Sequence, residues 1–348
     1  MKALRYRGER DIRCETISDP ALKDQSGVIV KMKACGICGS DLHIYHGQGF
    51  SKDDGYCVGH EAIGEIVETG RDVKSFKSGD EVMLAASVRS GDCGVCAACV
   101  GGMPVKCAKQ IWGCYGLSHA LEGCQAEAIA VPWADNNLSH IPEGITRDQA
   151  LLLTDNLPTA YMGCKNADIA PGKTVAVVGL GPIGLMAVEC AFVLGASRVF
   201  ALDLVPERRA LAAKLGATPI DPANAVEEIK ELSGGAMVDC SVEAVGGDKT
   251  IELAIALAGR GATISSFGVN QNQQFKYPVW TAFNKALTFR VAGCMVQSHW
   301  PELIPLVREK RLKPERFISH RMTLNDGAEA YRLFDGKLDG TLKVVLMP

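Results

Sequence analysis

The sequence has no uninterrupted apolar run of the roughly 20 residues that a membrane-spanning helix needs. Its most apolar stretch, residues 174–194, is interrupted by Gly179, Gly181, Pro182, Gly184 and Glu189. The segment therefore suits a buried strand, a turn and a helix better than a membrane span. The first fifteen residues also lack the apolar segment of a secretory signal peptide. We therefore expect a protein without membrane attachment.

A basic patch rich in aromatic residues is also missing. The net charge is −3, and the composition, with 47% hydrophobic and 22% charged residues, is that of a globular protein. These properties argue against nucleic acid as a partner. A chain of 348 residues is too long for one ordinary core and indicates two domains.

Cysteine, by contrast, is abundant. Fourteen cysteines without a secretory signal indicate a reducing cytoplasm and metal binding instead of disulfides. Four of them lie within fifteen residues, as Cys93-x-x-Cys96-x-x-Cys99 followed by Cys107. Thiolates this close, with glycines between them, fold around one tetrahedral Zn²⁺. The sequence therefore predicts a structural zinc site.

Two other interpretations of the four cysteines exist. One is a chance run of buried cysteines. The other is an iron–sulfur loop, because bacterial ferredoxins share the C-x₂-C-x₂-C spacing. In ferredoxins, however, the fourth cysteine follows after about three residues and precedes proline. Here Cys107 follows Cys99 after seven residues and precedes Ala108, which favours zinc.

The pattern of the chain changes near Lys173. Residues 1–150 read as short strands and turns, with strands expected at 28–33, 62–68 and 82–86. Beyond Lys173 strands and helices alternate, at 174–179, 183–194, 198–203, 206–215, 238–242, 250–258 and 262–267, and a last strand is expected at 342–347. Alternating strands and helices predict an α/β fold with a doubly wound parallel sheet.

A dinucleotide-binding motif opens this second part. Gly179-x-Gly181-x-x-Gly184 lies between the first apolar strand and its helix, where glycines permit a tight turn and close approach of a pyrophosphate. Asp203 ends the next strand, where a carboxylate binds ribose hydroxyls and repels a 2′-phosphate. We therefore expect NAD in preference to NADP, although Arg208 and Arg209 lie nearby. The alternative is a glycine turn without a ligand.

A second metal site is suggested more weakly by the residues themselves. Cys38 lies in a Gly- and Cys-rich segment, and His60 follows in Gly59-His-Glu61. Cys35-x-x-Cys38 also has the spacing of a redox pair, but no thioredoxin-like Trp or Pro frames it. Taken singly, a histidine such as His60 is more often a core or surface residue than a ligand.

Together these motifs resemble a zinc-dependent alcohol dehydrogenase of the medium-chain dehydrogenase/reductase superfamily. Within this superfamily, the sequence resembles the formaldehyde-dehydrogenase-like branch most. The resemblance covers essentially the whole chain. Besides the four cysteines, it rests on five segments: Gly36-Ile-Cys-Gly-Ser-Asp-Leu-His43, Gly59-His-Glu61, Gly79-Asp-Glu-Val82, Thr154-Asp-Asn-Leu-Pro-Thr159 and Gly179-Leu-Gly-Pro-Ile-Gly184. It implies a GroES-like, mostly-β catalytic domain (residues 1–155 and 291–348) and a Rossmann NAD-binding domain (residues 156–290).

The resemblance also implies a role for each matching residue. Cys38, His60 and Asp155 match the catalytic zinc ligands, Glu61 an acidic residue beside the metal, and Asp41 a carboxylate that orients His60. Ser40 and His43 match a proton relay. The resemblance also implies the cofactor contacts. In the glycine loop these are Gly179, Gly181, Pro182, Ile183 and Gly184, followed by Asp203 and Arg208. On the nicotinamide side they are Thr159, Phe267, Gly268 and Val269, and Lys343 lies near the phosphates.

The implied reaction is hydride transfer between an alcohol and NAD⁺. A homodimer or homotetramer is also implied, through an edge strand for which residues 287–292 are suited. The chain departs from the family pattern at two positions. Gly39 stands where some relatives carry a pyrophosphate-binding arginine, and Arg89 stands where relatives often have an apolar side chain that lines the substrate pocket. It also lacks the long cofactor-domain insertion of formaldehyde-dismutating relatives. A zinc-free NAD(P)H reductase of the same fold is the alternative.

Overall fold

The computed structural model describes residues 1–90, 96–97, 108, 112–272 and 274–348. The chain divides into two compact units. Unit 1 comprises Met1–Asp155, Met295–Arg308 and Lys313–Pro348, and unit 2 comprises Asn156–Cys294 and Glu309–Leu312. Residues 291–294, which we expected in the first domain, belong to unit 2, where β15 (Thr288–Val291) pairs with β14 (Ala258–Ser266).

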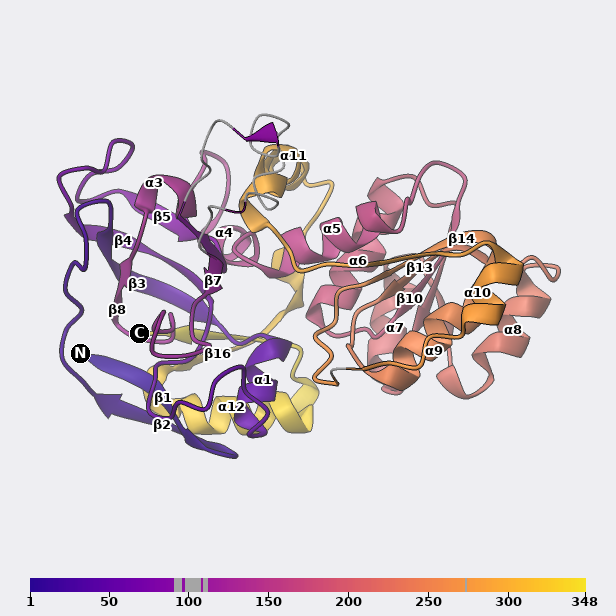
Figure 1. The fold of residues 1–348 in the computed structure, drawn as a ribbon, viewed down its shortest axis with the longest axis horizontal. Coiled ribbons are helices and arrows are strands. Elements are labelled where there is room, and N and C mark those ends of the chain that lie inside the picture. Colours follow the sequence, from indigo (N-terminus) through magenta and orange to yellow (C-terminus); the bar gives the residue numbers. More distant parts are fainter. Residues whose placement is uncertain (91–95, 98–107, 109–111, 273) are drawn as a thin grey trace. The chain divides into compact units, whose positions relative to one another are not determined.

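Unit 1 is built on a seven-stranded sheet that joins distant parts of the chain. Six strands follow the order β16-β17-β3-β4-β5-β9, and β8 also pairs with β3. Their bounds are β3 (Val28–Gly36), β4 (Glu61–Thr69), β5 (Glu81–Leu84), β8 (Ala128–Val131), β9 (Leu138–His140), β16 (Ile318–Thr323) and β17 (Lys343–Met347). Figure 1 shows the yellow C-terminal strands beside the indigo and purple strands of the N-terminal part.

Shorter elements surround this sheet in unit 1. Two strand pairs are β1 (Lys2–Gly8) with β2 (Asp11–Thr16), and β6 (Ser87–Arg89) with β7 (Trp112–Cys114). The helices are α1 (Gly39–Tyr45), α3 (Ala134–Asn137), α4 (Arg147–Leu152), α11 (Val296–Arg308) and α12 (Gly327–Gly336). Buried side chains from β1, β3, β4, β5 and α12 form one apolar core.

Unit 2 is a parallel sheet of six strands. Its strand order is β12-β11-β10-β13-β14-β15, and each adjacent pair is parallel. The remaining strands are β10 (Thr174–Val178), β11 (Arg198–Leu202), β12 (Thr218–Ile220) and β13 (Val238–Glu243). In chain order this is the 3-2-1-4-5-6 arrangement of the Rossmann fold. The α/β fold class with a doubly wound sheet is therefore confirmed.

The helices of unit 2 alternate with its strands as expected. They are α5 (Asn156–Asn166), α6 (Pro182–Val193), α7 (Pro206–Lys214), α8 (Ala225–Leu232), α9 (Asp248–Leu257) and α10 (Val279–Lys285). Proline in the first turn starts α6 and α7, and Gly195 and Gly216, both with positive φ, follow their C-terminal ends. None of the helices in the described part of the chain combines the length and apolar character needed to cross a bilayer.

Candidate metal centre and nucleotide-binding site

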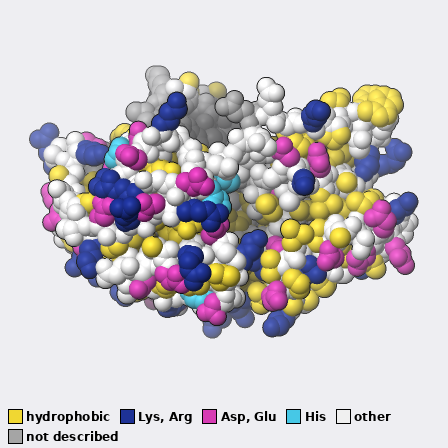
Figure 2. All heavy atoms as spheres, turned by 90° about the horizontal axis from the view of Figure 1, so that it is seen from below, with side chains coloured by type: hydrophobic (Ala, Val, Ile, Leu, Met, Phe, Trp, Pro, Cys, Tyr) yellow, Lys and Arg dark blue, Asp and Glu magenta, His cyan; other side chains and the backbone are white. Residues whose placement is uncertain are grey.

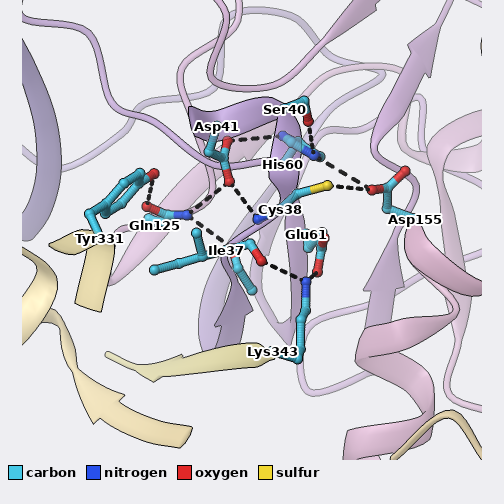
Figure 3. Close-up of polar contacts among 11 residues, drawn as sticks. Ile37, Cys38, Ser40, Asp41, His60, Glu61, Gln125, Asp155, Tyr331 and Lys343 are labelled. Atoms are coloured by element: carbon cyan, nitrogen blue, oxygen red, sulfur yellow. Dashed lines mark hydrogen bonds and ion pairs between the residues drawn. The ribbon is translucent and has the colours of Figure 1, made fainter. Parts of the chain in front are cut away.

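Four side chains of metal-ligand type meet in unit 1 (Figure 3). The ligand atoms of Cys38, His60, Glu61 and Asp155 all lie within 4.8 Å of one another. Cys38, His60 and Glu61 are buried, whereas the side chain of Asp155 is 14% exposed. We call these four residues the metal cluster; its accessible side is at Asp155.

The antiparallel register of β3 and β4 brings the first three cluster residues together. Gly36, the last residue of β3, pairs with Glu61, the first residue of β4. Cys38 therefore follows β3 at the same end of the sheet at which His60 precedes β4. Gly36 must lack a side chain, since a Cβ there would lie 2.1 Å from a carboxylate oxygen of Glu61.

Asp155 reaches the cluster from a tightly held turn after α4. The Leu153 carbonyl accepts a hydrogen bond from the Trp300 indole at 2.8 Å, and the Thr154 carbonyl accepts one from the Ala86 amide at 3.0 Å. The Thr154 hydroxyl bonds back to Leu151 at 2.6 Å. These bonds fix the backbone on which the Asp155 carboxylate is presented.

One carboxylate oxygen of Asp155 faces both neighbouring ligands. Its Oδ2 lies 3.3 Å from Cys38 Sγ and 3.6 Å from His60 Nε2. The Ser40 hydroxyl lies 3.2 Å from the same nitrogen. Thiol, imidazole and carboxylate thus point their ligand atoms at one place, with a hydroxyl beside them.

The other ring nitrogen of His60 faces Asp41. The Asp41 Oδ1 and His60 Nδ1 atoms are 3.3 Å apart, and Asp41 Oδ2 accepts a hydrogen bond from the Cys38 amide at 2.9 Å. Cys38 is the N-cap of α1 and Asp41 its third residue, so the carboxylate closes the helix terminus as in a capping box. The same short sequence therefore positions a thiol and orients an imidazole.

The electrostatics of the cluster fit a bound cation. Burial raises the pKa of the Cys38 thiol, and the Asp155 carboxylate raises it further. Burial opposes charge on His60, but Asp41 and other neighbours outweigh it and raise the pKa of the imidazole. Without a cation, burial therefore favours the neutral Cys38 thiol. A divalent metal with affinity for sulfur, nitrogen and oxygen would supply a positive charge that stabilises the thiolate beside the Asp155 carboxylate, and Zn²⁺ binds such mixed sets.

Glu61 differs from the other cluster residues because its counter-ion is a lysine from the last strand of the chain. Its carboxylate pairs with the Lys343 ammonium, and both side chains are completely buried. Lys343 also donates to the Ile37 carbonyl at 2.9 Å. The expected contact of Lys343 with cofactor phosphates would require the ammonium to leave Glu61.

The glycine motif of unit 2 has the shape of a pyrophosphate cradle. Gly179 has a φ of +92°, which favours glycine, and a Cβ at Gly184 would lie 1.8 Å from the Gly179 carbonyl oxygen. A Cβ at Gly181, the N-cap of α6, would meet nothing within 4 Å. Pro182 and Ile183 form the first turn of α6. Open space over a helix N-terminus suits an anionic ligand.

Asp203 is fixed beside this loop by backbone hydrogen bonds. Its Oδ2 accepts from the Leu180 amide at 2.7 Å and its Oδ1 from the Val205 amide at 2.8 Å. Arg208 lies 4.0 Å from the carboxylate. Arg209 instead donates to the Asp203 carbonyl and pairs with Asp221 at 3.0 Å. Arg209 thus pairs with Asp221, and among the residues that the structure describes Arg208 is the cation paired with the Asp203 carboxylate.

Comparison with known proteins matches both parts of the chain. Residues 24–143 match the alcohol dehydrogenase GroES-like domain, and residues 182–309 match the zinc-binding dehydrogenase family. A probable zinc-binding alcohol dehydrogenase of Mycobacterium tuberculosis is 40% identical over 350 residues, covering 100% of this chain and 89% of the relative.

This chain belongs to the zinc-binding alcohol dehydrogenase family.

Solved structures agree with this assignment. An alcohol dehydrogenase from Thermus sp. ATN1 is similar over 100% of this chain and 99% of its own, with a TM-score of 0.91 and 35% identity. An NADP-bound zinc-binding dehydrogenase from Sinorhizobium meliloti is similar over 100% and 99%, with a TM-score of 0.84 and 26% identity. The expected family is confirmed, whereas the formaldehyde-dehydrogenase-like branch stays a prediction.

Three further residues that the sequence pointed to lie on α1, α5 and β6 of this alcohol dehydrogenase. His43 follows Ser40 on α1, and its ring packs edge-on against Phe50 at 6.4 Å. Thr159 is buried on α5. Arg89 ends β6, and its backbone exchanges two hydrogen bonds of 2.9 Å with the Asn137 side chain.

The predicted structural zinc site also lies largely outside the described residues. Of its four cysteines only Cys96 is described, and it is partly buried. Cys93, Cys99 and Cys107 fall in the segments that the structure leaves out. The structural zinc of this alcohol dehydrogenase therefore stays a prediction. Cys35, the first cysteine of the Cys35-x-x-Cys38 pair, is buried, and its thiol donates to the Cys124 carbonyl at 2.8 Å.

Sequence reasoning missed Glu243, which organises the loops that follow β13 and β14 in unit 2. At the end of β13 its buried carboxylate accepts four hydrogen bonds of 2.8 Å, from the Val245 and Gly246 amides and the Thr250 and Ser266 hydroxyls.

Gly246 in turn contacts residues 268–269, since a Cβ there would lie 2.3 Å from the Val269 carbonyl oxygen. Glu243 thus supports the loop of Phe267, Gly268 and Val269. An acidic residue that ends an apolar strand before Gly246-Gly247 was the available signal.

Proposed function

We propose that this protein is an NAD-dependent alcohol dehydrogenase whose catalytic zinc is held by Cys38, His60 and Asp155. The supporting observation is the convergence of a thiol, an imidazole and two carboxylates within 4.8 Å in a family defined by zinc binding. Three protein ligands leave the fourth position of a tetrahedral zinc for substrate. Glu61, held by Lys343, stays beside the metal.

The chain's own residues supply positioning and proton removal. Bound zinc contributes the Lewis acidity that makes an alcohol hydroxyl acidic near neutral pH, and bound nicotinamide contributes the hydride acceptor. Ser40 Oγ, 3.2 Å from His60 Nε2, is placed to accept the proton that the alcohol loses. His43, one helical turn further along α1, passes that proton to solvent. Asp155, with 14% of its side chain exposed, is the most accessible member of the cluster.

The reaction class is tested by metal removal and an alcohol panel. We expect NAD⁺-dependent oxidation of primary, secondary or polyhydroxy alcohols that disappears when a chelator removes zinc and returns when zinc is added. Because the four-cysteine segment should bind a second zinc, about two zinc ions per chain are expected. Full activity in metal-free protein would instead support the zinc-free reductase.

Cofactor choice should follow Asp203. We expect kcat/KM to favour NAD⁺ over NADP⁺ by at least about tenfold, since a 2′-phosphate would face the fixed Asp203 carboxylate. Replacing this carboxylate by Asp203→Ala leaves Arg208 without its partner and should move the ratio toward NADP⁺. Arg208→Ala is the matched control and should move it toward NAD⁺. Equal use of both cofactors by the wild-type enzyme would contradict this assignment.

We also propose that the enzyme is a homodimer or homotetramer in the cytoplasm. β15 is an edge strand of the sheet of unit 2, and the nearby apolar side chains are strongly exposed: Val279 (69%), Trp280 (75%), Phe283 (76%) and Val291 (66%). Figure 2 shows such yellow side chains gathered on the surface of unit 2. Exposed apolar patches and open edges favour association. Light scattering should give a mass two or four times 37.1 kDa.

A further inference from the structure

A buried chain of hydrogen bonds extends away from the metal cluster beyond Asp41 (Figure 3). The Tyr331 hydroxyl donates to Gln125 Oε1 at 2.9 Å. Gln125 Nε2 donates to the Gly36 carbonyl at 2.9 Å and reaches Asp41 Oδ2 at 3.4 Å. Tyr331 and Gln125 are completely buried, and Asp41 is 1% exposed. Neither Gln125 nor Tyr331 belongs to a motif that the sequence singled out.

Gln125 is rigidly placed against the backbone that carries His60. The backbone amide of Gln125 donates to the Val58 carbonyl at 3.0 Å, and its backbone carbonyl accepts from the Leu4 amide at 2.8 Å. A Cβ at Gly59 would lie 2.4 Å from Gln125 Cγ, and Gly59 has a φ of +89°. Gln125 therefore contacts the turn before His60 as well as the carboxylate that faces its ring.

The neighbours of the Gln125 side-chain amide determine its orientation, because both groups near its nitrogen are hydrogen-bond acceptors. The Gly36 carbonyl and the Asp41 carboxylate both need a donor, so the NH₂ group must face them. The Tyr331 hydroxyl, by donating to Oε1, favours this orientation over the flipped one. A flipped amide would set its carbonyl against Asp41.

Asp41 in turn governs the His60 ring. Within the described residues, Asp41 Oδ1 and His60 Nδ1 have no hydrogen-bond partner other than each other, at 3.3 Å. Donors from Gln125 and the Cys38 amide fix Oδ2 and hence the plane of the carboxylate. A carboxylate held in this way keeps the proton on Nδ1 and leaves the Nε2 lone pair for a metal.

We propose that Gln125 and Tyr331 are positioning residues that set the zinc affinity of the metal cluster through Asp41 and His60. The proposal rests on the proposed function only in that the cluster binds zinc. Outer partners of metal-ligating histidines affect affinity by about 10–100-fold. We expect Gln125→Met, which keeps the side-chain length and loses every side-chain hydrogen bond, to weaken zinc binding by about tenfold or more. Tyr331→Phe should weaken it by a smaller factor.

The test measures the zinc dissociation constant with a competing chelator, well below the unfolding temperature. Asp155→Ala, measured in parallel, identifies which of the bound zinc ions belongs to the cluster. The visible spectrum of the cobalt-substituted proteins reports the geometry of the site independently of turnover. Tyr45→Phe is the matched control, because Tyr45 is buried against the Tyr331 ring at 5.5 Å; it should leave zinc affinity unchanged.

Non-additivity separates positioning from a merely structural role. Because Tyr331 acts through the Gln125 amide, the double variant should bind zinc no more weakly than Gln125→Met alone. Additive effects, or lower thermal stability with unchanged zinc affinity and cobalt spectrum, would overturn the proposal. A wild-type protein with no zinc in the cluster would contradict the proposed function itself, and the proposal with it.

Discussion

The Asp155→Ala enzyme should lose the zinc of the metal cluster and about 10³-fold in kcat/KM, equivalent to about 4 kcal/mol of transition-state stabilisation. Asp155 Oδ2 is the atom that faces both Cys38 Sγ and His60 Nε2. Burial opposes ionisation of this carboxyl, but the hydrogen bond from His60 outweighs it and lowers the pKa to about 2. The carboxylate is therefore charged throughout the neutral range. Its removal deletes a ligand and a negative charge together.

Zinc content per chain and steady-state kinetics check this result. Asp155→Cys is the informative companion, because a thiolate is also a good zinc ligand and should retain the metal and part of the activity. Asp148→Ala removes an exposed carboxylate from α4 and serves as the control for loss of an acidic side chain nearby in the chain. Asp155→Ala with full zinc and near-normal turnover would refute the assignment.

The second large effect is expected on stability, from Lys343→Met. This change leaves the Glu61 carboxylate buried without its counter-ion, and breaking a buried pair in this way costs about 3–5 kcal/mol. The Ile37 carbonyl loses its donor at the same time. We expect the unfolding transition of unit 1 to move to lower temperature and lower denaturant concentration. Circular dichroism during thermal and urea unfolding measures both shifts.

A double variant distinguishes loss of the ion pair from loss of packing. Glu61→Gln combined with Lys343→Met removes both charges at similar side-chain volume, so most of the lost stability should return. The partly exposed pair of Lys33 and Glu65, 2.8 Å apart, supplies the comparison: Lys33→Met should change stability by less than about 1 kcal/mol. If the double variant is as unstable as Lys343→Met, the buried charge is not the cause.

The sequence predicted the features that depend on neighbours along the chain. The strand, glycine turn and helix of residues 174–193 are set by local pattern, and the structure has them within a residue or two of the expected bounds. The parallel, doubly wound character of the sheet of unit 2 was predicted from the alternation of strands and helices, whereas its strand order came from the structure. Asp155 was different, because no local pattern marks it as a ligand. Only family resemblance placed it near Cys38, and the turn after α4 explains the placement physically.

Contacts between residues far apart in the chain could not be read from the sequence. Lys343 and Glu61 are separated by 282 positions, and Tyr331 and Gln125 by 206. Each pair forms because β17 and α12 return to strands made much earlier. A buried lysine or glutamine looks, in sequence, like any surface residue. The partner of Lys343 can be identified only when the register of β17 against β3 is known.

The position of Lys343 on the last strand of unit 1 links the metal cluster to the order of synthesis. Cys38, His60 and Asp155 leave the ribosome early, and the sheet of unit 2 is complete once β15 has been made. Domains fold as units during synthesis, so unit 2 gains its core while unit 1 still lacks β16 and β17. Until Lys343 is made, the Glu61 carboxylate lacks the counter-ion that it has in the finished protein. The buried Glu61–Lys343 pair is therefore a late contact of biogenesis, which forms after the strands of unit 2 have been synthesised.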